Sequence, residues 1–294
     1  MAIPTTRGIQ LTQGHQKYSS SIKIKCVQLN LQHSKNATYN LTQIILQENI
    51  DIAFVQEPYS ILNKVAGFPK SFKIFTQGNG RRKACIILNN YNIDVISINQ
   101  ISNEDCVAME FIYQNLHFYG ASMYFDCGKD IGRDIEKMGK IIDLAKDKGI
   151  ILCMDSNARS KLWHDITTNQ RGRTLEEFLI ISDLFLINEN TGIPTFETAR
   201  GCSWIDLTLC NNLLVRSVKD WTCGDEESCS DHKLIHFNIL KCKQDGNVFK
   251  HIGKRYIIKS EDFSKFEEKL ASRILTAFDI DKRDNLSKCD EALC

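Results

Sequence analysis

The sequence predicts an α/β fold built as a four-layer sandwich, in which two mixed β-sheets pack face to face and helices flank them. Three observations lead to this expectation. Short apolar or alternating runs recur along most of the chain, as β-strands do. Segments with helical periodicity stand between these runs. Many short strands with interspersed helices suit two packed sheets, and several of the apolar runs end in Asp, Glu or Asn.

The first elements form a strand, helix, strand unit. Residues 22–30 alternate and then become apolar, and residues 51–58 contain another short apolar run. Between them, residues 38–49 place apolar side chains at helical spacing, with Tyr39 on the same face. Several β-like runs separated by Gly, Asn and Asp then fill residues 72–122, which predicts successive antiparallel strands.

The second half of the chain alternates helices and strands. Residues 128–149 carry a long apolar helical face and lead into an apolar strand that ends at Asp155. The remaining elements are a short helix over 174–181 and strands over 184–190, 203–211 and 233–240.

The pattern divides the chain into three parts. Residues 1–22 are polar and unpatterned, which predicts a tail, and residues 23–242 form one domain. Residues 243–294 are rich in Lys, Asp and Glu, yet residues 261–278 keep an apolar helical face that needs a surface to cover. Either this helix docks back on the domain, or residues 243–294 form a linker toward a partner that lies beyond Cys294.

Composition narrows the class of protein. The chain has 294 residues, of which 43% are hydrophobic and 25% charged, enough apolar material for a large folded domain. The apolar runs are far shorter than the roughly 20 residues of a membrane helix, and the N-terminus lacks the apolar core of a secretory signal. We therefore expect an intracellular protein with no membrane partner. The net charge of +1 does not by itself indicate nucleic acid.

The twelve cysteines do not form a disulfide framework in the sequence pattern. Cys26, Cys85 and Cys153 stand within apolar runs, as Cys210 does, where a free thiol packs as a small hydrophobic group. Cys223 and Cys229 lie in a polar loop, so a structural metal site or a disulfide stays open there.

Polar side chains stand at the ends of several predicted strands. Asn30 ends the first apolar run, Glu57 follows a later one, and Asp155 and Asn157 end a third. Any one of these residues would also suit a turn or a cap. Taken together, they favour a shared site at one edge of the sheets.

Three further residues extend this set. Asp231 and His232 directly precede the last predicted strand. Asp206 lies within its strand, on the face opposite Leu207 and beside Trp204. Aspartate is disfavoured in mid-strand, and a buried carboxylate needs a donor or a cation, for which His232 is the natural candidate.

The residue types fit metal-assisted phosphodiester hydrolysis. Glu57 with Asp231 nearby would supply only oxygen ligands, which Mg²⁺ prefers. Asp155 with Asn157 would suit the orientation and deprotonation of a water molecule. A hydrogen bond between an aspartate and a histidine would fix the imidazole and favour its cationic form beside a phosphate.

A serine hydrolase is the competing reading, with Ser156 or Ser230 as the nucleophile near His232. Neither serine stands in a GxSxG elbow, and this reading would leave Asn30 and Glu57 without a role.

The ordered series VQLN, FVQEP, SMY, CMDSN, WIDLTL and SDH resembles the endonuclease/exonuclease/phosphatase superfamily. Within it, the chain looks most like the apurinic-type endonuclease domain at the front of non-LTR retrotransposon polyproteins. The segments NLQHSKNAT, DSNARSKLWHD, RGRTLEEFL and GIPTF add to that closer match, which covers residues 23–242.

The resemblance implies a DNase I-like fold and the nicking of chromosomal DNA to leave a 3′ hydroxyl that primes reverse transcription. It implies Mg²⁺, with Mn²⁺ as a possible substitute, and no small-molecule cofactor. Its implied partners are double-stranded DNA and a reverse transcriptase domain in the full-length polyprotein, and its implied place of action is the nucleus.

The resemblance also implies a role for each site residue. Glu57 would be the main Mg²⁺ ligand, supported by Asp231. Asn30 and Asn157 would position phosphate and water, and Asp155 would orient or deprotonate the water. Tyr124 and His232 would stabilise the scissile phosphate, with His232 oriented by Asp206.

Two positions depart from the family pattern. Gln32 stands where the repair enzymes usually carry an aspartate, and Cys127 stands where they often carry an asparagine. Both departures put the repair of abasic sites in doubt more than nuclease chemistry.

Two basic clusters are candidates for contact with DNA phosphates, although charged turns are also commonly just solvated. Trp163 follows the second cluster and would either reach DNA or anchor its loop. The clusters consist of Arg81, Arg82 and Lys83, and of Arg159 with Lys161.

Two alternatives remain open at this point. A phosphatase of the same fold would act on a small phosphorylated substrate, and a catalytically inactive relic would bind DNA without cutting it.

Overall fold

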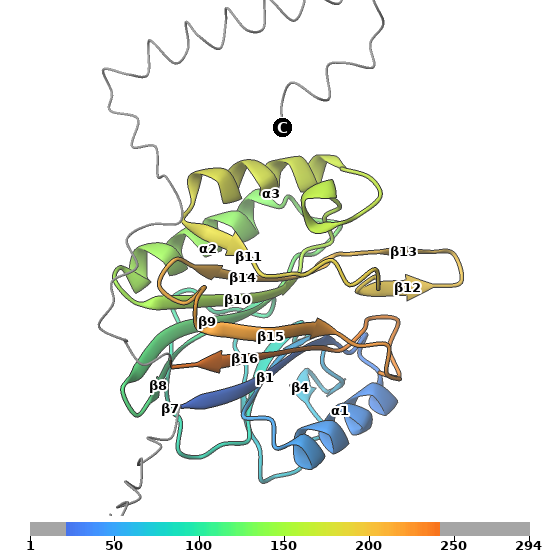
Figure 1. The fold of residues 1–294 in the computed structure, drawn as a ribbon. Coiled ribbons are helices and arrows are strands. Elements are labelled where there is room, and N and C mark those ends of the chain that lie inside the picture. Colours follow the sequence, from blue (N-terminus) through green and yellow to red (C-terminus); the bar gives the residue numbers. More distant parts are fainter. Residues whose placement is uncertain (1–21, 242–294) are drawn as a thin grey trace, which may run out of the picture. The chain divides into compact units, whose positions relative to one another are not determined.

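The computed structural model describes residues 22–241, and within them two six-stranded sheets face each other. Helix α1 lies outside one sheet, and helices α2 and α3 lie outside the other (Figure 1). The predicted four-layer sandwich is therefore confirmed. The expected N-terminal tail, all but Ile22, and the expected helix over 261–278 lie outside the described residues.

The first sheet has the strand order β15-β16-β1-β2-β6-β5. Strands β1 and β2 are parallel, and their neighbours pair antiparallel. The strands are β1 (Lys23–Asn30), β2 (Ile52–Gln56), β5 (Lys73–Phe75), β6 (Ala84–Leu88), β15 (Val218–Cys223) and β16 (Ile235–Leu240).

The second sheet has the order β11-β14-β10-β9-β8-β7, with β9 and β10 parallel and the other pairs antiparallel. Two small hairpins, β3 with β4 and β12 with β13, complete the strands. The remaining bounds are β7 (Asp94–Ser97), β8 (Cys106–Tyr113), β9 (Leu116–Tyr124), β10 (Gly149–Asp155), β11 (Leu184–Leu186), β14 (Asp206–Asn211), β3 (Ser60–Ile61), β4 (Lys64–Val65), β12 (Phe196–Thr198) and β13 (Gly201–Ser203).

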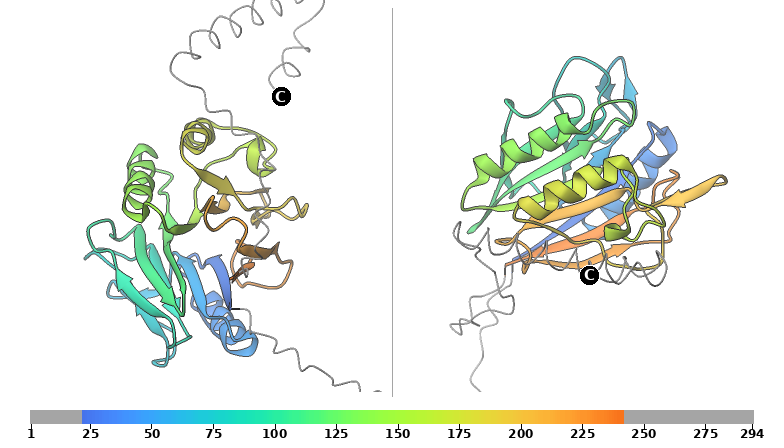
Figure 2. Two further views of the ribbon diagram at one scale, coloured as in Figure 1. Left: turned by 60° about the vertical axis from the view of Figure 1, so that its left-hand side comes forward. Right: turned by 90° about the horizontal axis from the view of Figure 1, so that it is seen from above.

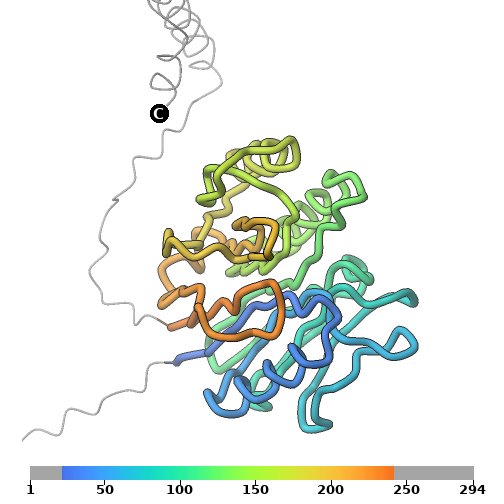
Figure 3. Tube along the Cα trace, turned by 90° about the vertical axis from the view of Figure 1, so that its right-hand side faces the viewer, coloured from blue at the N-terminus to red at the C-terminus, as the bar shows by residue number. Residues whose placement is uncertain are grey.

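The helices follow the apolar faces that the sequence predicts. Helix α1 (Lys35–Glu48) begins after the cap Ser34, whose hydroxyl accepts a hydrogen bond from the Ala37 N–H group. Helices α2 (Gly132–Ala145) and α3 (Gln170–Ile181) lie side by side over the second sheet (Figure 2). A turn of 3₁₀ helix, η1 (Lys161–Trp163), precedes α3. Figure 3 shows α1 on the opposite side of the sandwich from α2 and α3.

Three apolar clusters hold the layers together. One fills the space between the sheets, where Phe54 contacts Phe111 and Phe237 at ring-centroid distances of 6.3 and 6.2 Å. A second lies under α2 and α3, and a third lies under α1. Both faces of each sheet are therefore covered over much of their area, which explains why β2, β6, β10 and β14 are buried along their whole length.

The order of the strands brings particular ends together at one edge. Strands β1, β2, β9 and β10 end at this edge, because β1 is parallel to β2 and β9 is parallel to β10. Strands β14 and β16 run antiparallel to their neighbours and begin there, with Asp206 directly opposite Asp155. The structure thus gathers at one rim the polar residues that the sequence places at separate strand ends.

Several expectations about single elements are corrected. The strands over 72–122 divide between the two sheets, because β5 and β6 pair in the first and β7, β8 and β9 pair in the second. Tyr39 is 48% exposed and does not share the buried face of α1. Helix α3 begins at Gln170, four residues before the expected Thr174, since Asn169 caps it. No helix among residues 22–241 is long and apolar enough to cross a membrane.

The described cysteines behave as the sequence suggests. Cys26, Cys85, Cys153 and Cys210 are buried free thiols. Cys223 is also free and buried, whereas Cys229 is exposed, so no disulfide joins the pair within the described residues.

Candidate active site

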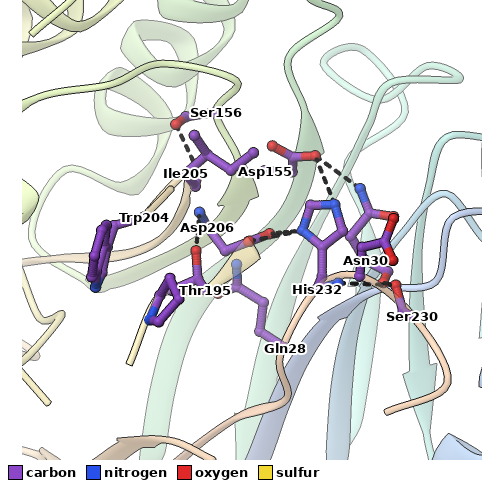
Figure 4. Close-up of polar contacts among 12 residues, drawn as sticks. Gln28, Asn30, Asp155, Ser156, Thr195, Trp204, Ile205, Asp206, Ser230 and His232 are labelled. Atoms are coloured by element: carbon purple, nitrogen blue, oxygen red, sulfur yellow. Dashed lines mark hydrogen bonds and ion pairs between the residues drawn. The ribbon is translucent and has the colours of Figure 1, made fainter. Parts of the chain in front are cut away.

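The centre of the site is the imidazole of His232, which lies between two buried carboxylates (Figure 4). Its Nδ1 atom is 2.8 Å from Oδ2 of Asp206, and its Nε2 atom is 4.0 Å from Oδ2 of Asp155. Asp206 is 1% exposed and Asp155 is 2% exposed. The Nδ1–H group therefore donates to Asp206, which directs Nε2 toward the opposite side.

The surroundings shift the pKa of both partners of this pair. Burial lowers the pKa of His232, but the negative charge of Asp206 and its hydrogen bond outweigh burial, so the pKa lies above its ordinary value. Burial raises the pKa of Asp155, and the charge of Asp206 adds to this effect, while His232 opposes it. Asp155 is thus a stronger base than an ordinary aspartate, and His232 keeps its proton more firmly than an ordinary histidine.

Two asparagines hold Asp155 in place. Nδ2 of Asn30, at the end of β1, donates to Oδ2 of Asp155 at 2.8 Å, so this bond joins the two sheets. The main-chain N–H of Asn157 donates to Oδ1 of Asp155 at 3.1 Å. Asn157 has a left-handed backbone with φ of 45°, which asparagine tolerates better than most residues. Its own Nδ2 donates to the carbonyl of Phe125 at 3.0 Å.

Glu57 and Tyr124 line a pocket of about 290 Å³ together with Asp155, Asn157 and His232. Glu57 directly follows β2, and its Oε1 is 3.3 Å from Nε2 of His33. Burial raises the pKa of Glu57, but the hydrogen bonds and positive charges of the surroundings, led by His33, outweigh it and lower the pKa. Burial and the charges of Glu57 and Asp155 raise the pKa of Tyr124, so its phenol stays protonated.

Asp231 is exposed and lies outside the residues that line the pocket. Its Oδ2 accepts a hydrogen bond of 3.0 Å from Nε2 of Gln32, and its N–H donates to Oε1 of the same amide at 2.9 Å. Gln32, one of the two departures from the family pattern, therefore holds Asp231 through both ends of its amide. Cys127, the other departure, is an exposed free thiol.

The predicted basic residues differ in their position. Lys83 binds Asp126 at 2.5 Å, with its ammonium 5.1 Å from the centre of the Tyr124 ring. Arg159 lines the pocket and lies 3.9 Å from Asp165. The others lie away from the pocket lining: Arg81 and Lys161 are exposed, and Arg82 donates to the carbonyl of Gly80.

The structure settles the positions of two tryptophans, Trp163 and Trp204. Trp163 is 0% exposed and donates through Nε1 to the carbonyl of Ala158, so it anchors its loop and does not reach DNA. Trp204 packs against the apolar cluster under α2 and α3 rather than beside Asp206 (Figure 4). From Asp206 onward the predicted alternation holds, because Asp206 and Thr208 both face the other sheet.

The serine-hydrolase reading does not fit these contacts. The hydroxyl of Ser156 donates to the carbonyl of Ile205 at 2.7 Å, and that of Ser230 donates to the carbonyl of Asn30 at 2.8 Å. Both hydroxyls are held by main-chain acceptors, and the ring of His232 is held by Asp206.

Sequence reasoning missed two neighbours of the site. The ring of Phe196 lies 4.8 Å from that of His232, centre to centre, and covers one side of the imidazole. His33 lies beside Glu57 and hydrogen-bonds through Nδ1 to the carbonyl of Pro58 at 3.0 Å. Both belong to segments of the family resemblance, GIPTF and NLQHSKNAT, but nothing in the chain pattern assigns them a partner.

Two groups of side chains within residues 22–241 have the types and spacing that could hold a metal ion. One is the buried set Asp155, Asp206 and His232, whose ligand atoms lie within 4.8 Å of one another. Nδ1 of its imidazole is hydrogen-bonded to Asp206 and is therefore not free to bind a metal ion. This set is better described as a network of one histidine and two aspartates. Glu57, half-buried at the pocket and with a lowered pKa, is the carboxylate that remains available to a cation.

Comparisons with known proteins agree with this picture. A family model described as endonuclease-reverse transcriptase matches residues 118–236. The Retrovirus-related Pol polyprotein from type-1 retrotransposable element R1 of Bradysia coprophila is 29% identical over 187 residues, which are 60% of this chain and 19% of that polyprotein. The Putative 115 kDa protein in type-1 retrotransposable element R1DM of Drosophila melanogaster is 23% identical over 84% of this chain and 25% of its own length. The chain thus spans about a fifth to a quarter of these relatives.

Solved structures extend the comparison to the fold. The endonuclease domain of TRAS1, a telomere-specific non-LTR retrotransposon, has a TM-score of 0.67 and 27% identity, and the match covers 74% of this chain and 98% of that domain. The AP endonuclease LMAP from Leishmania major has a TM-score of 0.59 at 10% identity, over 74% of this chain and 87% of that one. In sequence, fold and site, the chain is similar to the endonuclease domains of non-LTR retrotransposons, and through them to the endonuclease/exonuclease/phosphatase superfamily.

Proposed function

We propose that this chain is a Mg²⁺-dependent endonuclease that nicks double-stranded DNA and leaves a 3′ hydroxyl as a primer for reverse transcription. The observation that carries the proposal is the placement of His232 between Asp206 and Asp155, beside a pocket that Glu57 and Tyr124 also line. A charged imidazole, a basic carboxylate and a free carboxylate around one open pocket are the groups that phosphodiester hydrolysis needs.

The donor set at the pocket fits Mg²⁺. Glu57 supplies carboxylate oxygens and carries a lowered pKa, so it is ionised at neutral pH. When bound there, the metal would draw negative charge from a non-bridging phosphate oxygen and from the departing O3′. Mn²⁺ takes the same oxygen ligands and would substitute.

The protein groups supply the rest of the reaction. Asp155 orients a water molecule and takes its proton as the water oxygen bonds to phosphorus, and the raised pKa of Asp155 favours that transfer. Asn157 helps to orient the same water through its amide oxygen, since its nitrogen is committed to Phe125. The P–O3′ bond breaks, the O3′ oxygen takes a proton from solvent water and becomes the 3′ hydroxyl, and Asp155 returns its proton to solvent.

Two donors stabilise the phosphate while this bond breaks. His232, held as a cation by Asp206, donates through Nε2, and Tyr124 donates through its protonated phenol. Asn30 keeps Asp155 aligned from the other sheet. Asp231 supports the rim of the metal site through its contact with Gln32.

Basic residues near the pocket would hold the DNA backbone. Arg159 lines the pocket, and Lys83 lies over the ring of Tyr124, so both are close to where the scissile phosphate would bind. Arg81, Arg82 and Lys161 would contact phosphates farther along the duplex. In the full-length polyprotein, the partner would be a reverse transcriptase domain, and the place of action would be the nucleus.

The test is the relaxation of supercoiled plasmid by the purified chain, with Mg²⁺ and with EDTA. Nicking should require the metal and should disappear in Glu57→Ala and His232→Ala. The control is His117→Ala, because His117 on β9 pairs with Glu110 and is not among the residues that line the pocket. Unchanged nicking by either site variant contradicts the assignment.

Turnover of a soluble phosphate ester instead of plasmid would favour the phosphatase, and a folded chain that binds but never cuts DNA would favour the inactive relic.

A further inference from the structure

Arg171 lies in the first turn of α3 and belongs to the segment RGRTLEEFL, which has no assigned role in catalysis. Its guanidinium donates hydrogen bonds to four main-chain carbonyls. Nε donates to Asn157 at 3.0 Å and Nη1 to Lys129 at 2.8 Å. Nη2 lies 3.4 Å from the carbonyl of Phe125 and 3.3 Å from that of Ser156.

These carbonyls come from two loops that carry the site. One loop follows Tyr124 at the end of β9, and the other follows Asp155 at the end of β10. The two strands are parallel neighbours, with Asp155 opposite Tyr124, so the loops leave the sheet side by side. Several carbonyl oxygens then converge on one region, and buried carbonyls require donors.

A guanidinium is suited to this task because it carries five N–H donors in a rigid plane and stays charged at all working pH values. Within residues 22–241, the hydrogen bonds of the Arg171 side chain all go to carbonyls of the two loops. Helix α3 has its own cap in Asn169 and its own apolar anchors in Leu175 and Leu179. The guanidinium therefore contributes to the loops rather than to the attachment of the helix.

The contact acts most directly on Asn157. Arg171 binds the main-chain carbonyl of Asn157, and both side chains donate to the same acceptor, the carbonyl of Phe125. Asn157 has the left-handed φ of 45°, a conformation that needs support from its surroundings. Its N–H also holds Asp155. We propose that Arg171 is the positioning residue that clamps the two loops and so fixes Asn157 and Asp155 in their working geometry.

This inference rests on the proposed nuclease function, and the test separates the two. The variants are Arg171→Met, which keeps the alkyl stem, and Arg171→Lys, which keeps the charge but not the planar donors. The control is Arg173→Met, because Arg173 is exposed on the same helix. Plasmid nicking is measured under saturating and limiting DNA, so that kcat and KM are obtained separately.

We expect Arg171→Met to lower kcat by up to about 100-fold, since a displacement of about 1 Å in a catalytic group has that effect. KM should change by less than about threefold, because the clamp does not contact DNA. Arg171→Lys should recover only part of the rate, and Arg173→Met should resemble the unaltered chain. Full activity of Arg171→Met or Arg171→Lys would overturn the proposal, and if Arg171→Met fails to fold, the lysine variant decides.

A double-mutant cycle tests whether Arg171 acts through Asn157. In an Asn157→Ala background, Arg171→Met should lower kcat by a smaller factor than in the unaltered chain, because the Asn157 amide is already absent and only the effect on Asp155 through the main chain remains. An undiminished effect in that background would contradict the proposal. The side-chain amide resonances of Asn157 give a readout without activity, and they should shift in Arg171→Met but not in Arg173→Met. If the unaltered chain does not nick DNA, the proposed function fails, whereas this spectrum still decides the role of Arg171.

Discussion

At the scale of single residues, burial and the charge of Asp206 together set the pKa of His232 and of Asp155. His232 is almost fully buried, which favours a neutral ring, yet Asp206 at 2.8 Å makes the cation the stable form. Asp155, at 2% exposure, is made more basic by burial and by Asp206. Proximity to Asp206 thus keeps His232 charged as a hydrogen-bond donor and makes Asp155 a better proton acceptor.

Asp206→Asn tests this pairing. The substitution removes the charge that holds the pKa of His232 above its ordinary value, so the pKa should fall. Because the reaction needs the imidazolium, which is lost as the pH rises through its pKa, the alkaline limb of the nicking profile should move to lower pH. At neutral pH, kcat should fall by about 100-fold. The measurement is the pH profile of kcat, and Asp94→Asn on exposed β7 is the control. An unchanged alkaline limb would show that the imidazolium is not the required form.

His33→Ala tests the carboxylate on the other side of the pocket. Hydrogen bonding and charge from His33 lower the pKa of Glu57 against the effect of burial, together with Asn30 and His232, so the loss of His33 should raise this pKa. Glu57 binds a cation only in its ionised form, which is lost as the pH falls through its pKa. A higher pKa in the variant should therefore move the acid limb of metal binding to higher pH. Titration calorimetry of Mn²⁺ at several pH values measures this shift. Identical acid limbs in the two proteins would remove His33 from the description of the site.

At the scale of secondary-structure elements, the start of α3 is built against the loop after β10. Oδ1 of Asn169 accepts hydrogen bonds from the N–H groups of Gly172 and Arg159, and the N–H of Asn169 donates to the carbonyl of Arg159. A Cβ atom on Gly172 would lie 1.8 Å from that same carbonyl oxygen. Only glycine fits there, since the obstacle is main chain and not a flexible side chain.

Gly172→Ala should therefore destabilise the fold by about 3 kcal/mol, the upper range for an overpacked site. The matched control is Gly139→Ala in α2, where no heavy atom lies within 4 Å of the added carbon. That substitution should stabilise the chain by up to about 1 kcal/mol, because alanine is the better helix former. Urea denaturation of both variants measures the difference. Equal stability of the two would mean that the contact between α3 and the loop relaxes at little cost.

Sequence reasoning missed strand β15 and misplaced the start of α3, each for its own physical reason. Strand β15 has no clean alternation, and its pairing with β16 shifts register between Lys219 and Thr222, where Asp220 has a positive φ. The start of α3 was placed late because Asn169 reads equally well as a loop residue. Strands with two covered faces, such as β10, were predictable because uninterrupted burial leaves a continuous apolar run.

At the scale of the whole molecule, the rim of polar strand ends was predictable, but the polar contacts between the sheets were not. Asn30, Asp155 and His232 could be assigned because strand order brings chain-distant ends to one edge. Gln28 and Gln56 are themselves fully buried and join the sheets through their amides. A single amide in an apolar run gives no indication of which strand it will face, so only the packed structure reveals such contacts.

These two glutamines set the spacing between the sheets, and they should differ in what they contribute. Nε2 of Gln28 donates to the carbonyl of Met154 at 3.1 Å, and its Oε1 accepts from the hydroxyl of Thr208 at 3.1 Å. Nε2 of Gln56 donates to Ser122 and to the carbonyl of Cys153, but its Oε1 is buried without a partner. Replacing Gln28 leaves the buried Thr208 hydroxyl without an acceptor for its proton, although the hydroxyl still accepts from Nε1 of Trp221. Replacing Gln56 also removes an atom that has no partner.

Gln28→Met should cost about 2 to 3 kcal/mol, and Gln56→Met about 1 kcal/mol or less, because a buried polar group left without a partner is the larger penalty. Each variant is the control for the other, since both place a methionine between the same two sheets. Urea denaturation gives the stabilities, and nicking under folded conditions shows whether the sheets keep Asn30 aligned with Asp155. The reverse order of stabilities would contradict this account. A loss of kcat in Gln28→Met that exceeds its loss of folded protein would show that the spacing of the sheets sets the geometry of the site.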